Sequence, residues 1–182
     1  MEKLLNKAKD IKIIFFDIDD TLRVKDTGFM PASLTHIFEI LHQKGILTGI
    51  ATGRNLCGVV PEIKALHPDF FVTANGAYVI DKSDQVIYKQ SLPQKVVLDI
   101  VEWLTTSSAE YVVYGADQVV ASAWSDTMQS AIEPIYGQLP IDPDYHLTHD
   151  IYQMVTMSEH DDQLTLPEKL SERARTVRRP EY

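Results

Sequence analysis

Two acidic residues stand directly after an apolar run near the start of the chain. Asp17 and Asp19 follow the segment IKIIFF at 11–16, within the longer sequence FFDIDDTL. The run is rich in β-branched and aromatic residues, which predicts a strand buried on both faces, as in a parallel sheet. Ligands of open parallel sheets bind beyond the carboxyl ends of the strands, so Asp17 and Asp19 are expected to face one small site.

Two carboxylates at this spacing favour chemistry on phosphorus. One carboxylate can attack a phosphorus atom, while the other protonates the leaving oxygen and later activates water. A divalent cation would relieve the repulsion between the two charges, and hard oxygen ligands select Mg²⁺. The competing interpretation is a polar loop after a strand. A D-x-D pattern alone leaves that alternative open, whereas an apolar run followed by D-x-D-x-T-L is much more specific.

A second candidate segment is Thr52-Gly53-Arg54, which ends the apolar run ILTGIAT at 46–52. A hydroxyl, a flexible glycine and the amides at the start of a helix can together cradle a phosphate. Arg54 could add charge or brace the loop. Taken alone, this segment also fits an ordinary strand-to-helix turn. Because its strand follows the one that carries Asp17, the two loops are expected to lie side by side.

The first part of the chain alternates strand-like and helix-like patterns. The strand-like segments are 11–16, 46–52 and 70–74, and helices are expected from Pro31 and from about Asn55 to Ala65. Strand, helix, strand, helix, strand is the order of a doubly wound parallel sheet. The sequence therefore predicts an α/β fold with a Rossmann-like sheet.

The pattern changes after Asn75. The segments AYVID and VIYKQ predict a β-hairpin. Amphipathic helices then mix with strand-rich segments, and a last helix is expected in LPEKLSERA. This order is typical of a separate α+β unit. We expect one domain over 1–77 and a second over 78–182.

Three segments together resemble the haloacid dehalogenase superfamily. FFDIDDTL is similar to its first motif, IATGR at 50–54 to its second, and NGAYVID at 75–81 to the entry into the large lid of the Cof-like branch. The resemblance runs from about Lys12 to about residue 170. It implies part of a doubly wound core with an inserted α+β cap, and a Mg²⁺-dependent phosphatase that acts on small phosphorylated metabolites.

The resemblance also implies roles for individual residues. Asp17 would be the nucleophile and a Mg²⁺ ligand, and Asp19 the general acid/base, with its main-chain carbonyl on the metal. Thr52 would hold the phosphoryl group, within a phosphate-binding loop that also contains Gly53 and Arg54. The hinge into the lid would be formed by Asn75 and Gly76.

The third and fourth motifs of the superfamily are missing from this sequence. They are a lysine that neutralises the aspartate and phosphate charges, and a Gly-Asp-x-x-Asn-Asp loop that completes the metal site. No glycine follows Gly137, the pair Asp161-Asp162 fits a solvated turn, and Lys169 fits a surface position. We therefore expect the resemblance to be truncated before these motifs. The first alternative to an active phosphatase is a catalytically incompetent protein that binds phosphate or a partner, or that needs a second chain.

Another alternative is a phospho-acceptor domain like a bacterial response regulator. That domain also places an aspartate on a doubly wound sheet. Its acceptor, however, follows a later strand, and the lid-like second half would be unexplained. We rank this alternative below the others.

Composition limits the partners and the location of the protein. The chain has 182 residues, 45% of them apolar, and a formal net charge of -9, which disfavours binding to nucleic acid or to anionic membranes. The charged N-terminus does not fit a secretory signal, and no apolar run reaches the roughly 18 residues of a membrane span. We expect a cytoplasmic protein. In the family that the chain resembles, later strands cover the other side of the 11–16 strand. Without them the resemblance implies that this strand lies at a sheet edge, which favours self-association or a complementing chain.

Overall fold

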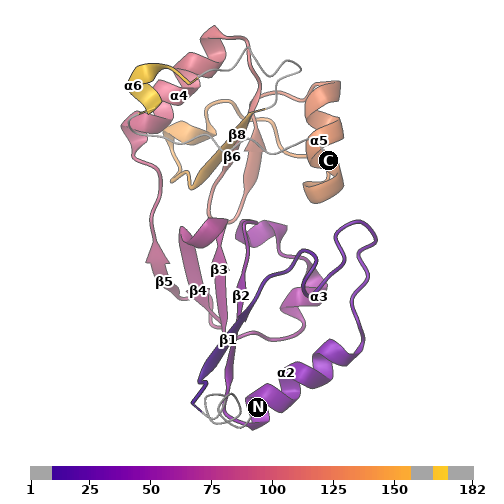
Figure 1. Cartoon of the computed structure of the whole chain (residues 1–182). Helices are drawn as coiled ribbons and strands as arrows, with labels where there is room; N and C mark the ends of the chain where they lie inside the picture. The colour runs from indigo at the N-terminus through magenta and orange to yellow at the C-terminus, as the bar shows by residue number, and fades with distance from the viewer. Residues whose placement is uncertain (1–9, 157–165, 172–182) are drawn as a thin grey trace. The chain divides into compact units, whose positions relative to one another are not determined.

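The computed structural model of the chain describes residues 10–156 and 166–171 (Figure 1). It divides into two compact units, Met1–Gln90 and Ser91–Tyr182. The part of the chain that is described contains no helix both long and apolar enough to cross a membrane.

The first unit is built on a five-stranded sheet in the order β1-β2-β3-β4-β5. Strands β1 to β3 run parallel, and β4 and β5 are added antiparallel as a hairpin. The strands are β1 Ile13–Phe16, β2 Leu47–Ala51, β3 Phe70–Thr73, β4 Tyr78–Asp81 and β5 Val86–Lys89. The helices are α2 Ser33–Gln43 and α3 Pro61–Lys64, with short 3₁₀ turns at Leu56–Gly58 and Ala74–Gly76. The predicted α/β fold with a parallel-rich sheet is confirmed.

The two described helices of this unit, α2 and α3, pack on the same face of the sheet. Phe38 of α2 and Ile63 of α3 belong to one buried cluster with Ile50, Phe71 and Ile80 of successive strands. Burial of these side chains supplies the main stabilisation of the unit, since each fully buried large apolar side chain contributes about 1.5–3 kcal/mol.

Strand β1 differs from the prediction that both of its faces are buried. Phe16 packs against the core cluster, but Phe15 points to the opposite face and is 48% exposed. β1 is the outermost strand, and no described helix covers its second face. The apolar run therefore predicted the strand correctly, but the prediction that both of its faces are buried was wrong.

The helix expected over 55–65 is interrupted. The Asn55 side chain caps the 3₁₀ turn by accepting a hydrogen bond from the Gly58 amide at 3.2 Å. Val60 is extended at ψ 150°, as residues before proline usually are, and α3 begins only at Pro61. The loop after Arg54 is thus a capped turn, not the start of a long helix.

The division between the two units falls later than the expected boundary at residue 78. The hairpin of β4 and β5 pairs with β3 in the first sheet, so that residues 78–90 lie in the first unit. The segments AYVID and VIYKQ form the predicted hairpin, and its first strand pairs with β3, which precedes it by one short turn. Hydrophobic alternation does not identify such a partner.

The second unit is an α+β fold with a three-stranded antiparallel sheet in the order β7-β6-β8. Its elements are α4 Gln94–Thr106, β6 Tyr111–Tyr114, β7 Val119–Ala121, α5 Asp126–Tyr136, a 3₁₀ turn Tyr145–Leu147, β8 Gln153–Thr156 and α6 Glu168–Ser171. Alternate residues of the fully buried β6 belong to two different apolar clusters, one with α4 and one with α5. Of the expected last helix only α6 is described, Lys169 is exposed on it, and Asp161-Asp162 lies outside the described residues.

Candidate active site

The acidic loop after β1 is anchored by two apolar side chains. Ile18 is fully buried and Leu22 is 3% exposed. The Ile18 carbonyl accepts hydrogen bonds from the amides of Leu22 and Arg23 at 3.0 and 2.9 Å, which closes a tight turn. These anchors fix the backbone on either side of the acids, so that Asp17 and Asp19 stand at the carboxyl end of β1.

Asp20, the third acid of the loop, serves the turn itself. Its φ of 59° lies in the left-handed region, which aspartate tolerates better than most residues. Its amide donates to the Arg23 carbonyl at 2.7 Å, and its carboxylate accepts a hydrogen bond from the Lys25 amide at 3.0 Å. Asp20 therefore stabilises the turn through hydrogen bonds with its backbone. A substitution of Asp20 is thus a matched control for substitutions of the other two acids.

The second loop places a buried hydroxyl at the end of β2. Thr52 is 7% exposed, and its amide donates to the Val72 carbonyl at 2.9 Å. Its hydroxyl oxygen accepts a hydrogen bond from the Arg54 amide at 3.2 Å. A hydroxyl that accepts one bond still has its own proton to donate. The loop thus presents a fixed donor at the edge of the sheet where Asp17 also lies.

Arg54 joins the two loops through a forked ion pair with Asp19. Its Nε donates to one carboxylate oxygen at 2.9 Å and its Nη2 to the other at 2.7 Å, while Nη1 donates to the Gly58 carbonyl at 2.9 Å. The side chains are 12% and 29% exposed. A two-point contact of this kind fixes the orientation of a carboxylate as well as its charge. Sequence reasoning left open whether Arg54 braces the loop, and the structure shows that it does.

Asn75 and Gly76 complete the rim in a turn between β3 and β4. Both have positive φ angles, 56° and 92°. The Asn75 amide donates to the Thr52 carbonyl at 3.3 Å, and a Cβ atom on Gly53 would lie 2.9 Å from the Asn75 Oδ1. Asn75 thus packs directly over the Thr52 loop. The turn lies within the first unit, ahead of the division after Gln90. The role of Asn75 and Gly76 as a hinge stays a prediction.

Asp17 has an exposed carboxylate, and no described residue donates a hydrogen bond to it or pairs with it. A nucleophile needs an accessible lone pair, so this environment suits an attacking group. The local charge is unfavourable for an anionic substrate, because the loop carries three acids and Arg54 is already paired with one of them.

The oxygen ligands that the described residues offer would fill only part of the coordination shell of a magnesium ion. The described residues contain no group of three acidic, histidine or cysteine side chains that could hold a metal. The Asp17 carboxylate and the Asp19 main-chain carbonyl offer two oxygen atoms, whereas Mg²⁺ needs six near-octahedral oxygens, several of them from water.

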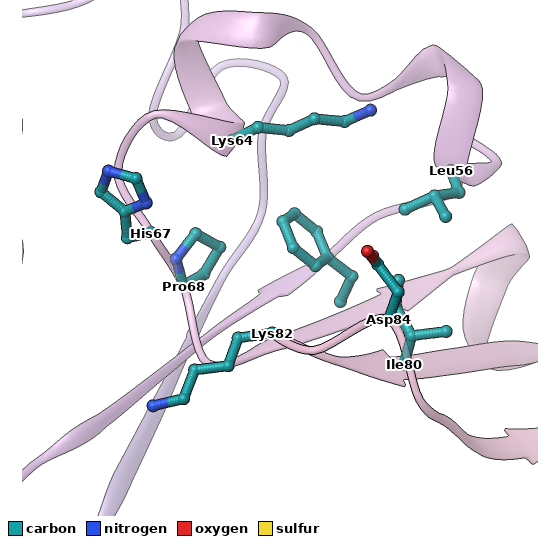
Figure 2. Close-up of a pocket in the computed structure, with 8 residues that line it drawn as sticks. Leu56, Lys64, His67, Pro68, Ile80, Lys82 and Asp84 are labelled. Carbon is teal, nitrogen blue, oxygen red and sulfur yellow. The ribbon is translucent and has the colours of Figure 1, made fainter.

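A cavity of about 340 Å³ lies elsewhere in the first unit (Figure 2). It is lined by Leu56, Lys64, His67, Pro68, Phe71, Ile80, Lys82 and Asp84. None of the predicted site residues is among them. The Lys82 ammonium points away from the cavity in Figure 2 and binds the Asp69 carboxylate at 3.0 Å. The cavity therefore carries no chemistry related to Asp17.

Comparison with known proteins gives consistent matches over most of the chain. The model of the haloacid dehalogenase-like hydrolase family matches residues 14–179. A Streptococcus pyogenes protein, named provisionally as a bifunctional phosphatase/peptidyl-prolyl cis-trans isomerase, is 47% identical over 176 residues, which are 97% of this chain and 37% of that protein.

Solved structures match the same fold. A hypothetical protein from Geobacillus kaustophilus is 30% identical with a TM-score of 0.77, over 84% of this chain and 60% of that one. A sugar phosphatase of haloacid dehalogenase subclass IIB is similar in fold, with 24% identity and a TM-score of 0.66, over 80% of this chain and 58% of that one. The chain spans less than two thirds of the length of each of these proteins.

Proposed function

Because the chain belongs to the haloacid dehalogenase-like hydrolases, we propose that Asp17 and Asp19 are the catalytic pair of a phosphatase acting on small phosphorylated metabolites. The observation that carries the proposal is that the two acids have different surroundings. Arg54 holds both oxygens of Asp19, while the Asp17 carboxylate is exposed and unpaired among the described residues. Asp19 is held in position, and Asp17 is free to attack.

The proposed reaction has two steps. In the first, an Asp17 oxygen attacks phosphorus, the bond from phosphorus to the leaving oxygen breaks, and Asp19 gives its proton to that oxygen. In the second, Asp19 takes a proton from water, the water oxygen attacks phosphorus, and the bond to Asp17 breaks. Inorganic phosphate leaves, and both aspartates return to their starting states.

Arg54 has a defined part in these steps. The guanidinium pairs with the ionised form of Asp19, and protonation of either carboxylate oxygen would cost one of the two hydrogen bonds. In the protonated state of Asp19 one of these bonds would therefore be lost, and the other would keep the carboxyl group oriented. Thr52 would donate its hydroxyl proton to a phosphoryl oxygen, and glycine at position 53, where a Cβ atom would lie 2.9 Å from the Asn75 Oδ1, lets the Thr52 loop lie close to Asn75.

We also propose Mg²⁺ as the cofactor. Its ligands from this chain would be the Asp17 carboxylate and the Asp19 main-chain carbonyl. When bound, the ion would neutralise charge between Asp17 and the substrate phosphate. The remaining ligands would have to come from water, substrate or polypeptide outside the described residues. The names of the Streptococcus relative and of the subclass IIB sugar phosphatase support the phosphatase activity and the class of substrate.

A second candidate function is phosphate or partner binding without turnover. The two-oxygen donor set and the three acids of the loop argue against turnover, because a site that lacks a neutralising charge stabilises the transition state poorly, and the Thr52 hydroxyl is the donor that would hold a phosphate.

An assay with a generic aryl phosphate separates the two candidates. Turnover would be measured with and without Mg²⁺ for the unchanged chain, for Asp17→Asn and for Asp20→Asn as the matched control. We expect magnesium-dependent turnover that falls at least about 1,000-fold in Asp17→Asn, as losses of nucleophiles do. Asp20→Asn should stay within a few-fold, because asparagine keeps the oxygen that accepts the Lys25 amide.

Equal background rates in all three proteins would contradict catalysis by this chain. In that case binding of inorganic phosphate would be measured by calorimetry. Binding that is weakened by Thr52→Val would support the second candidate.

A further inference from the structure

The cavity shown in Figure 2 has an apolar floor built on two neighbouring strands. Phe71 of β3 and Ile80 of β4 are paired directly in the sheet and are 9% and 2% exposed. Pro68 is also buried, and Leu56 adds to the apolar lining. The cavity volume of about 340 Å³ lies in the range of small-molecule sites, which combine apolar walls with a few polar groups. An apolar group that enters the cavity would leave water for this floor.

The walls of the cavity are fixed by hydrogen bonds of the backbone. Lys64 is the last residue of α3, and its carbonyl accepts a hydrogen bond from the His67 amide at 3.0 Å. The turn between β4 and β5 is closed by a bond from the Asp84 amide to the Asp81 carbonyl at 3.1 Å. The cavity is therefore preformed, and the side chains of Lys64 and Asp84 extend from fixed points of the backbone.

Two oppositely charged side chains reach the cavity from these two elements. Figure 2 shows Lys64 extended over the cavity and Asp84 pointing toward it. Among the described residues, neither side chain has an ion-pair or hydrogen-bond partner. Both are therefore free to bind a ligand, Lys64 as a positively charged donor and Asp84 as a negatively charged acceptor.

A second lysine of the lining is already engaged elsewhere. The Lys82 ammonium points away from the cavity in Figure 2 and binds the Asp69 carboxylate at 3.0 Å. Asp69 also accepts a hydrogen bond from the Thr48 amide, so that this ion pair belongs to the packing between strands. The His67 imidazole adds a further hydrogen-bonding group to the lining. The cavity thus presents one free ammonium and one free carboxylate above an apolar floor.

We propose that this cavity binds a free amino acid with a large apolar side chain. The ligand carboxylate would accept hydrogen bonds from the Lys64 ammonium, and the ligand ammonium would donate to the Asp84 carboxylate. The ligand side chain would pack on Phe71 and Ile80, and an aromatic ring would gain further from contact with the Phe71 ring. A zwitterion is the class of small molecule that matches one cation, one carboxylate and an apolar floor at the same time.

Other classes of ligand match this lining less well. A phosphate ester is strongly anionic, and the Asp84 carboxylate would repel it. A segment inside a polypeptide has neither terminal charge and would leave Lys64 and Asp84 without partners. The cavity is also separate from the candidate active site, since Asp17, Asp19 and Thr52 are not among its lining residues. The amino-acid site is therefore independent of the proposed function.

Nuclear magnetic resonance titrations of the full 182-residue chain test the proposal. The probes are L-phenylalanine, 3-phenylpropionate, which lacks the ammonium group, and 2-phenylethylamine, which lacks the carboxylate. We expect phenylalanine to shift the amide resonances of Leu56, Phe71 and Ile80 with a dissociation constant on the order of 1 mM, as the efficiency of small ligands allows. Each analogue should bind about 3–10-fold more weakly, because it loses one charged contact at an exposed rim.

Two charge substitutions should separate the three probes. Lys64→Met should weaken binding of phenylalanine and phenylpropionate by about 3–10-fold and leave phenylethylamine unchanged. Asp84→Asn should weaken binding of phenylalanine and phenylethylamine and leave phenylpropionate unchanged, and asparagine tolerates the φ of 61° at this position. Glu62→Gln, a charge change on α3 outside the lining residues, is the control and should affect none of the probes.

The absence of resonance shifts at about 10 mM phenylalanine would overturn the proposal, because this concentration is about tenfold above the expected dissociation constant. Equal affinity for the three probes, or affinities that neither charge substitution changes, would reduce the site to an apolar contact. Shifts centred on Thr52 and Gly53 would place phenylalanine at the candidate active site instead. Inorganic phosphate that competes with phenylalanine for the cavity would assign it to anions in general. Each of these results contradicts a site for a zwitterion.

Discussion

At the scale of single residues, the contact that most constrains the site is the fork between Arg54 and Asp19. Three guanidinium nitrogens are used, two on the carboxylate and one on the Gly58 carbonyl. A lysine could not reproduce this pattern, because its ammonium is a point charge without a planar fork. Arg54 therefore fixes both the position of Asp19 and the path of the loop.

We predict that Arg54→Gln lowers the free energy of unfolding by about 1 kcal/mol, because charge-assisted bonds at a partly exposed site contribute at the low end of their range. It should also reduce any magnesium-dependent turnover by up to about 100-fold, since Asp19, the proposed acid/base, would lose its fixed orientation. Urea unfolding and the aryl phosphate assay measure the two effects. Arg23→Gln is the control, because the Arg23 side chain makes only a 3.5 Å contact to the Lys25 carbonyl. Equal losses in both variants would contradict a specific role for Arg54.

Sequence reasoning could identify the residues of the candidate site but not their pairing. Asp17, Asp19 and Thr52 follow strands, and strand ends can be predicted from local hydrophobicity. The partner of Arg54 depends on the exact path of a turn set by Ile18 and Leu22, which no local pattern encodes. The catalytic and metal-binding roles of these residues remain predictions.

At the scale of elements, the buried carboxylate of Asp69, just before β3, binds residues of β2 and of the hairpin of β4 and β5. These residues are distant from Asp69 in sequence. Asp69 accepts a hydrogen bond from the Thr48 amide at 3.0 Å, pairs with Lys82 at 3.0 Å and lies 3.3 Å from His42. Burial raises the pKa of Asp69, but the Thr48 amide, the Lys82 ammonium and the nearby His42 outweigh that effect, so that the pKa falls below its ordinary value.

This lowered pKa predicts a pH dependence of stability. A carboxylate with a lower pKa in the folded state stabilises the fold above its unfolded pKa of about 3.9, and the contribution is lost as the pH falls through the folded pKa. Asp69→Ala should therefore cost about 1–3 kcal/mol at pH 7, mainly from the unsatisfied Thr48 amide, and the difference from the unchanged chain should shrink below about pH 4. Urea unfolding at several pH values measures it. Asp84→Asn, at an exposed hairpin position, should show no such trend.

Most elements were predictable because their signals are local. Apolar runs predicted β1, β2 and β3, and 3.6-residue periodicity predicted α2, α4 and α5. The interruption between Asn55 and Pro61 was missed, although a capping residue and a proline are both visible in the sequence. The Asp69 cluster had no signal at all, because its four members come from separate elements that only the fold brings together.

At the scale of the whole molecule, the two units have separate apolar cores. The cluster around Phe38 contains residues of the first unit only, and the clusters around Val97 and Met128 contain residues of the second unit only. The stability of each unit therefore depends chiefly on its own packing.

Core substitutions should reveal this independence. Phe38→Ala and Met128→Ala each remove a side chain that is at most 1% exposed, at a cost of about 2–5 kcal/mol. We expect Phe38→Ala to accelerate amide exchange in 10–90 and to leave 91–156 unchanged, with the reverse for Met128→Ala. Mass spectrometry of exchanged peptides resolves the two regions. Acceleration throughout the chain in either variant would indicate one cooperative unit.

The hairpin that closes the first sheet has a practical consequence for protein engineering. Since β4 and β5 are bonded to β3, all five strands of the first sheet are in place before the chain leaves the first unit, and the last described backbone bond there joins the Gln90 amide to the Ala77 carbonyl. A graft point just after Gln90 would exchange the second unit for that of a relative while every bond around Asp19, Thr52 and Arg54 is retained. A library of such hybrids would vary the second unit while these contacts of the first unit stay the same.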